Sequence, residues 1–427
     1  MNRITIIAVI FLIVPKGFAQ MDSISLTQCL LAAREKSAVN GQSKIVEDIA
    51  ALKMTNARVS YLPSVSAYGK AWYQSDAVTV TGPTGPMIEV DRFQYNTGLE
   101  ADQPIYDGGL SKHRRELERA IMDSEEGKIE MELYQLNSLL TDLYFNSVLI
   151  DKKNSAIQLK IDVLTKRLKE VEAAVNAGLV KGNQVDEIKV ELLSSQQQQL
   201  EIEKLRQQTI TSLSLYTGLD IQFGTTFILS DIPEIYPSSI RPEYKYFDAE
   251  MNRLESMSDL QKGKKLPHIG AYGQAGYSYP GLNFFENEPA YYYIVGARLS
   301  WNIFDWKQNK RDTEVLLKQK EIIETKKTDF EQKIEIAMKK ELIEQQKLSD
   351  IIKIDEELIR QRTAVTKASE TSLLQGVITS TDYLEDLNAE INARINLETH
   401  KTQLQESLIQ YELLKGIDTI NLVVNNN

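Results

Sequence analysis

Residues that could carry out chemistry are sparse in this chain of 427 residues. Its three histidines and single cysteine are too few for a dedicated metal site, and one cysteine cannot form an internal disulfide. The sequence contains no glycine-rich phosphate loop, no HExxH motif and no Ser/His/Asp grouping. We therefore expect a protein that is not an enzyme, with no catalytic residue, no bound metal and no cofactor. Any energy that it uses must come from a partner.

The net charge and the N-terminus indicate where the protein works. A formal charge of −11 gives no reason to expect a nucleic-acid partner. A short basic start, an apolar run over residues 4–14 and a small-x-small site at residues 17–19 predict a secretory signal peptide that is cut after Ala19. The alternative, a membrane anchor, needs about 20 apolar residues to cross a ~30 Å hydrocarbon core, and this run is shorter. Cys29 lies past the cut and is not placed as a lipid-bearing first residue.

An internal repeat sets the architecture. Residues 61–73 (YLPSVSAYGKAWY) match residues 265–277 (KLPHIGAYGQAGY), and residues 93–109 match residues 291–307, with Gly98 on Gly296. A repeat of this kind indicates two similar halves of one fold rather than unrelated domains.

The repeated segments have the pattern of strands. In segment 93–101 the residues Phe93, Tyr95 and Leu99 alternate with polar residues, and segment 291–303 alternates in the same phase. About ten residues of period-2 alternation with aromatic ends are typical of a membrane β-barrel strand. They are equally typical of an ordinary half-buried antiparallel strand. Residues 76–91 and 280–290, rich in glycine or proline, are expected to be loops.

Almost all the rest is predicted to be helical. The expected helices are 25–60, with Thr27 as a cap candidate, and 110–176, 183–217, 307–374 and 381–415. Residues Leu316, Ile323, Phe330, Ala337, Ile351, Leu358 and Val365 keep a seven-residue step that is broken only at Glu344, which is the coiled-coil signature. At 1.5 Å per residue each of the two longest helices spans roughly 100 Å, far more than a globular core.

Each long helix is predicted to reverse at a glycine. The two turns surround Gly178 and Gly376, and each is followed by a new polar cap. The predicted division is a signal peptide 1–19, repeat 1 at 20–218 (strands about 64–75 and 91–106, tip 176–183), a linker 219–241, repeat 2 at 242–416 (strands about 267–279 and 291–304, tip 374–382) and a tail 417–427.

From about residue 22 to residue 416 the chain resembles the TolC-like outer-membrane efflux protein family. The resemblance rests on the signal peptide, the duplicated helix–strand–strand–helix–turn–helix plan and the two glycine-centred turns. It rests also on the strand exits Tyr106-Asp107-Gly108-Gly109 and Phe304-Asp305-Trp306. The implied fold is mainly α with a transmembrane β part: a long helical coiled-coil barrel, two structural repeats and four strands per chain.

The resemblance implies a homotrimer whose strands form a shared twelve-stranded barrel in the outer membrane, in contact with its lipid. Four strands cannot close a barrel, and an open sheet edge is forbidden in lipid, so the strand count itself requires oligomerisation. The expected lipid-facing residues are Phe93, Tyr95, Leu99, Tyr291, Tyr293, Leu299 and Trp301. The expected lumen-facing residues are Glu100, Asp102 and Arg298.

By the same resemblance, the two turns form a periplasmic tip that docks to an adaptor (membrane fusion) protein and an inner-membrane pump of the RND or ABC type. The adaptor-contacting residues would be Ala177, Gly178, Leu179, Gln375, Gly376 and Val377. The alternative is that the two glycines only stop their helices.

The resemblance also places candidate pore-constricting acids at Asp382 and Glu385, since rings of carboxylates favour cations. Asp382 could instead be an acid that stabilises a helix start. Leu373, Ile378 and Gln184 stand where well-known members carry the tyrosine, arginine and acid of their closing network, so a closed state held by those same bonds is not expected.

The function that follows is a channel-tunnel in the outer membrane of a Gram-negative bacterium, with a periplasmic helical extension. It would be the passive exit duct of a tripartite efflux or type I secretion system. The alternatives are a periplasmic coiled-coil scaffold and a stand-alone porin-like barrel. The long helices argue against the porin, which needs none.

Overall fold

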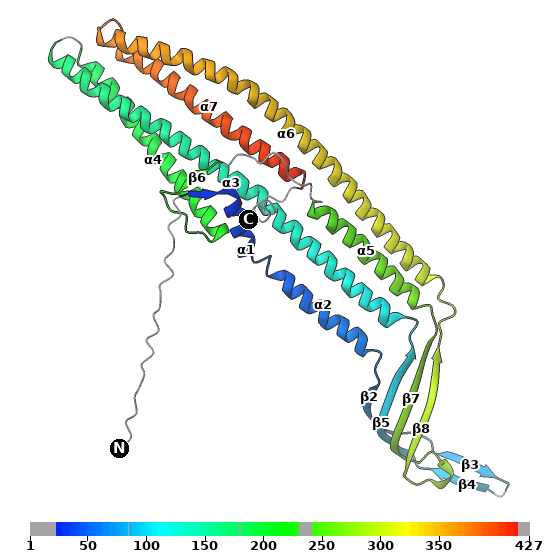
Figure 1. The fold of residues 1–427 in the computed structure, drawn as a ribbon. Helices are drawn as coiled ribbons and strands as arrows, with labels where there is room; N and C mark the ends of the chain where they lie inside the picture. Colours follow the sequence, from blue (N-terminus) through cyan, green and yellow to red (C-terminus); the bar gives the residue numbers. More distant parts are fainter. Residues whose placement is uncertain (1–22, 84, 179–180, 230–240, 417–427) are drawn as a thin grey trace, which may run out of the picture. The chain divides into compact units, whose positions relative to one another are not determined.

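The computed structural model describes residues 23–83, 85–178, 181–229 and 241–416 (Figure 1). The predicted signal peptide, the predicted tail and Leu179 lie outside the described residues. The chain divides into two compact units. We call Ala38–Tyr134 with Ser239–Ile336 the strand unit, and Met1–Ser37 with Gln135–Ser238 and Ala337–Asn427 the tip unit.

A four-stranded antiparallel sheet lies in the strand unit. Its strands are β2 (Ser64–Tyr73), β5 (Phe93–Tyr106), β7 (His268–Tyr279) and β8 (Ala290–Ser300), in the order β2-β5-β7-β8. Both repeats therefore contribute two neighbouring strands to one sheet, and β2 and β8 are its edges (Figure 1).

Tyrosine rings cover three glycines of this sheet. Tyr68 is paired with Gly98, Tyr292 with Gly276, and Tyr272 with Gly296. A Cβ added to Gly296 would lie 2.7 Å from the Tyr272 ring, so the glycine leaves the space that the ring fills. Gly98 and Gly296, which match in the two repeats, are thus packing positions between strands.

The segment expected to be a glycine- and proline-rich loop over residues 76–91 is mostly a hairpin. Strand β3 (Val78–Gly82) pairs antiparallel with β4 (Gly85–Val90), outside the main sheet. The prediction was wrong because glycine and proline mark only the turn, while the residues on either side have β-branched character. The corresponding segment in the second repeat holds a single 3-10 turn, η1 (Phe284–Glu286).

Two helices of 67 residues each continue from the sheet. They are α3 (Leu110–Asn176) and α6 (Gln308–Leu374). The start of each is capped by an aspartate: Asp107 accepts bonds from the backbone N–H groups of Gly109 and Ser111, and Asp305 from those of Lys307 and Asn309. The repeated aspartate at the strand exit is therefore a helix cap, which satisfies N–H groups that have no partner inside the helix.

The first expected helix, residues 25–60, is two helices. They are α1 (Leu26–Lys36) and α2 (Gln42–Val59). The cap of α1 is Ser25, which exchanges hydrogen bonds with Gln28 in a capping box, and not Thr27. The break spans residues 37–41 and contains Asn40-Gly41, residues that favour turns over helix interiors. In the strand unit, α5 (Pro242–Gly263) corresponds to α2.

The tip unit holds α1, α4 (Asn183–Thr217) and α7 (Ser380–Leu414) with the distal parts of α3 and α6. It also holds a short parallel pair, β1 (Ser23–Ser25) with β6 (Thr226–Ile228), and β6 lies inside what was predicted to be linker. The buried Tyr144 hydroxyl donates to the carbonyl oxygen of Ile24 at 3.0 Å and also contacts that of Ile228. One tyrosine on α3 therefore fixes both short strands.

The described helices are mostly amphipathic and charged. None of them combines the length and the apolar character needed to cross a membrane. The chain is mainly helical with a small number of strands, which confirms the predicted fold class at that level.

Candidate channel surfaces and helical tip

One face of the four-stranded sheet is strongly apolar and exposed. Tyr291 is 88% exposed, and Tyr293, Phe93, Leu99 and Leu299 are also more than half exposed. The register places Leu99 beside Ala275, which is opposite Tyr293, so these side chains share a face. An apolar surface of this kind marks contact with a membrane or another protein.

Aromatic side chains gather on that face. The Tyr277 and Tyr291 ring centroids are 4.8 Å apart, and Tyr95 lies 6.1 Å from Tyr277 and 6.3 Å from Phe93. Trp301 lies one residue beyond β8, and its indole N–H donates to the Lys265 carbonyl oxygen at 3.0 Å. Tyrosine and tryptophan are enriched at the two interfaces of a membrane because their rings are amphipathic.

The other face carries the predicted lumen residues. Asp102 is paired with Tyr272, and Glu100 with Gln274 on the same strand. The Arg298 guanidinium lies 5.1 Å from the Tyr272 ring centroid. The structure therefore brings these three charged residues to one face, together with the tyrosines that cover the glycines.

The two predicted turns are exposed and need their glycines. Gly178 has φ +73° and Gly376 has φ +69°, a left-handed conformation that side-chain-bearing residues rarely adopt. The Val377 N–H donates to the Ser372 carbonyl oxygen at 2.9 Å, which closes the end of α6. Ala177, Gln375 and Val377 are exposed. The backbone conformation of the two glycines therefore ends both helices. The exposed residues beside them remain accessible to another protein.

Of the two predicted constriction acids, Asp382 caps α7. Its carboxylate accepts from the Thr379 N–H at 2.9 Å and from the Thr379 hydroxyl at 2.6 Å, and Thr379 Oγ1 accepts from the Asp382 N–H. These bonds from Thr379 hold the pKa of Asp382 below its ordinary value. Glu385, one turn on, is exposed, and its side chain forms no hydrogen bond or ion pair with any residue that the structure describes.

A buried arginine near the turns was not expected from the sequence. Arg167 on α3 is 2% exposed and lies between Glu170 and Glu370, with its Nη1 2.7 Å from the Glu170 carboxylate. Its guanidinium lies 5.1 Å from the ring of the buried Tyr383 on α7. A buried charge requires such partners, so Arg167 ties α3 to α6 and α7. No spacing in the sequence marks a lone arginine of this kind.

The positions where the resemblance gave no reason to expect a closing network carry uncharged side chains. Leu373 is buried in the apolar cluster near the turns. Gln184 accepts a bond from the Ser380 hydroxyl at 3.3 Å, and the next pair along is Thr381 with Glu187 at 3.0 Å. Two hydrogen bonds therefore join α4 to α7 here, one between uncharged side chains and one from a hydroxyl to a carboxylate.

A sheet assembled from two repeats, continued by long helical hairpins, is the fold of known outer-membrane channels. CmeC of Campylobacter jejuni matches with a TM-score of 0.69 at 13% identity, over 94% of this chain and 88% of that chain. VceC of Vibrio cholerae matches with 0.68 at 12%, over 92% and 96%. The open-state MtrE channel of Neisseria gonorrhoeae matches with 0.66 at 15%, over 98% and 99%.

The family model of the outer membrane efflux proteins matches residues 48–219 and 242–416, and the chain belongs to this family. It is an outer-membrane efflux duct with a periplasmic helical part, as the sequence predicted. The family and the matching structures are channel proteins. No curated protein sequence matches the chain.

Proposed function

We propose that three copies of the chain close a twelve-stranded barrel in the outer membrane and form the passive exit duct of a tripartite efflux or type I secretion assembly. The observation that carries the proposal is the four-stranded sheet, whose edges β2 and β8 pair with no further strand among the described residues. Unpaired strand edges are not tolerated in lipid, and four strands are too few to close a barrel. Two neighbouring copies can supply the missing partners.

The two faces of the sheet suit this arrangement. The exposed aromatic and aliphatic face, with Phe93, Tyr95, Leu99, Tyr291, Tyr293 and Leu299, would contact lipid, and Trp301 would lie at its edge. The face with Glu100, Asp102 and Arg298 would line the lumen. Apolar-out and polar-in alternation is what a membrane barrel requires.

The exposed turns are the proposed docking surface for a periplasmic adaptor and its RND- or ABC-type pump. The contacting residues would be Ala177, Gly178, Gln375, Gly376 and Val377, with Leu179 by its position in the sequence. A partner must supply the energy, because the proposed duct is not an enzyme. Asp382 and Glu385, just after the second turn, would form rings of carboxylates in the trimer and favour cations.

The mass of the detergent-solubilised protein from isolated outer membranes tests this proposal. Light scattering corrected for bound detergent is expected to give three times the chain mass. A monomer in the outer membrane would favour the stand-alone barrel. A protein found only in the soluble periplasm would favour the coiled-coil scaffold. Either result would overturn the shared barrel.

A further inference from the structure

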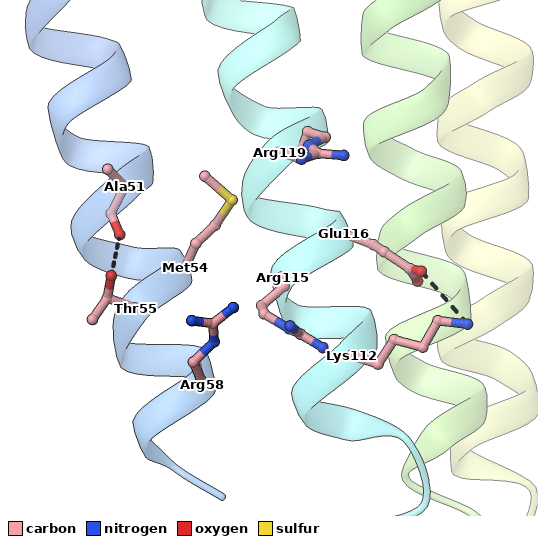
Figure 2. Close-up of a pocket in the computed structure, with 8 residues that line it drawn as sticks. All are labelled: Ala51, Met54, Thr55, Arg58, Lys112, Arg115, Glu116 and Arg119. Atoms are coloured by element: carbon pink, nitrogen blue, oxygen red, sulfur yellow. Dashed lines mark hydrogen bonds and ion pairs between the residues drawn. The ribbon is translucent and has the colours of Figure 1, made fainter.

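A basic pocket lies in the strand unit between α2 and α3. It has a volume of about 590 Å³ and is formed by the last turns of α2 and the first turns of α3. Figure 2 shows Met54 and Arg58 extending from α2 toward α3. The pocket is lined by Ala51, Met54, Thr55, Arg58, Lys112, Arg115, Glu116 and Arg119.

Three of the cations in this pocket have no acidic partner among the residues that the structure describes. In the described part of the chain, Arg58, Arg115 and Arg119 form no ion pair, and all three are exposed. The one lining carboxylate, Glu116, is already engaged: it lies 3.8 Å from Lys112 Nζ and 3.1 Å from His113 Nδ1. The Lys112–Glu116 pair is drawn in Figure 2. The pocket thus holds an excess of positive charge that no described residue of the chain neutralises.

The second repeat supplies an internal comparison. Val59 and Gly263 end α2 and α5, and Leu110 and Gln308 begin α3 and α6, so positions can be matched one to one. The equivalents of Arg115 and Arg119 are Thr313 and Leu317.

The remaining basic positions of the second repeat are balanced by acids. Lys262, the equivalent of Arg58, lies 2.7 Å from Asp259, and Lys310, the equivalent of Lys112, lies 3.7 Å from Glu314. The helix packing of the fold therefore does not require the three unpaired arginines. Their charge in the first repeat points to a bound anion.

The place of the pocket suggests which anion. Arg58 is in the last turn of α2, just before β2, and Lys112 is in the first turn of α3, just after β5. At 1.5 Å per residue, all the lining cations of α3 lie within about 15 Å of the start of that helix. The exposed Tyr61, Leu62 and Tyr106 occupy the junction between pocket and sheet. If the sheet spans the membrane, this is the headgroup layer.

The lining also favours a lipid over a free anion. Met54, Ala51 and the aliphatic stems of the arginines add apolar lining to the cationic groups of the pocket. Basic pockets beside membrane-spanning elements bind anionic headgroups. We propose that this pocket binds the phosphate of an anionic phospholipid, such as phosphatidylglycerol, at the periplasmic surface of the membrane. The proposal rests on the proposed membrane sheet.

Native mass spectrometry of the full-length, detergent-purified protein tests the site. The protein is titrated with phosphatidylglycerol and, separately, with phosphatidylcholine. The wild type is expected to bind phosphatidylglycerol more tightly. The triple variant Arg58→Gln, Arg115→Gln, Arg119→Gln is expected to lose most of that preference, about fivefold for each arginine near the membrane surface. The matched control Lys262→Gln, Lys310→Gln, in the equivalent place of the second repeat, is expected to keep it.

Three outcomes would overturn the site. The triple variant could keep the lipid preference, or the control could lose it to the same extent, which would indicate a general charge effect. Millimolar inorganic phosphate could displace the lipid from the wild type, which would indicate a free-anion site. Light scattering and circular dichroism on the same samples verify that each variant is folded and assembled. If the wild type is a folded trimer without a preference for phosphatidylglycerol, only the lipid site is refuted. If the wild type is absent from the outer membrane, the proposed duct is refuted.

Discussion

At the scale of single residues, the clearest titrating group outside the sheet is Glu406 on α7. Burial, and then the nearby carboxylates of Asp142 on α3 and Glu341 on α6, raise its pKa to about 7 from 4.5. Between these two pH values the folded protein holds a proton that the unfolded chain has lost. The free energy of unfolding must therefore fall as pH rises through this window.

Replacing Glu406 by glutamine should remove this dependence. Because the group is only partly buried, we expect Glu406→Gln to stabilise the protein by about 1 kcal/mol at pH 8 and to have almost no effect near pH 5. Chemical denaturation at both pH values, followed by helical circular dichroism, measures the difference. Glu324→Gln, at an exposed position, controls for the loss of a surface charge. A gain of equal size at both pH values would contradict the assignment.

At the scale of elements, the contact of β5 with β7 depends on Gly98. A Cβ at this position would lie 2.4 Å from the Ala275 carbonyl oxygen and 2.8 Å from the Gly276 Cα, and both are backbone atoms that cannot move aside alone. The strands would have to separate locally, and the Tyr68 hydroxyl, 3.0 Å from the same point, would have to shift.

We therefore expect Gly98→Ala to destabilise the sheet by about 1–3 kcal/mol, the usual cost of overpacking. The temperature at which the detergent-solubilised protein loses its folded electrophoretic mobility reports the loss. Gly69→Ala is the matched control, because the nearest atom to its Cβ, Thr97 Oγ1, is 3.7 Å away. Equal melting temperatures for the two variants would show that the close approach of the strands at Gly98 does not determine the stability of the sheet.

At the scale of the whole molecule, the acids after the second turn should set the ion selectivity of the duct. The Glu385 side chain has no partner in the described part of the chain. The Asp382 carboxylate, in contrast, is already hydrogen-bonded to Thr379 at the start of α7. Glu385→Gln is therefore the cleaner change, since it removes the charge of a ring without disturbing the start of α7. Asp382→Asn removes charge and weakens the cap together.

Reversal potentials in planar bilayers under a salt gradient measure this selectivity. We expect Glu385→Gln to lower the cation-to-anion permeability ratio several-fold, and the double variant with Asp382→Asn to lower it further, since ring charges concentrate counter-ions in a narrow pore. Glu201→Gln, on α4 away from the turns, should leave the ratio unchanged. An unaltered ratio in the double variant would place the selectivity of the channel elsewhere.

The sequence by itself determined the plan of this protein. The repeat, the long helices and the turns at Gly178 and Gly376 were all visible, because hydrophobic period and turn chemistry are local properties. The family resemblance followed from their order. Local pattern also misled: residues 76–91 form a hairpin, residues 25–60 form two helices with a cap at Ser25 rather than Thr27, and the predicted linker holds a strand.

The tertiary structure alone decided what distant segments do to each other. It paired β1 with β6, surrounded Arg167 with acids from two helices and closed the Asp382 capping box. It also brought Arg58 beside the first turns of α3 as an uncompensated cluster. These features depend on which faces meet and which charges find partners. Both are decided by packing between residues far apart in the chain, and the local hydrophobic pattern of the sequence carries no information about such packing.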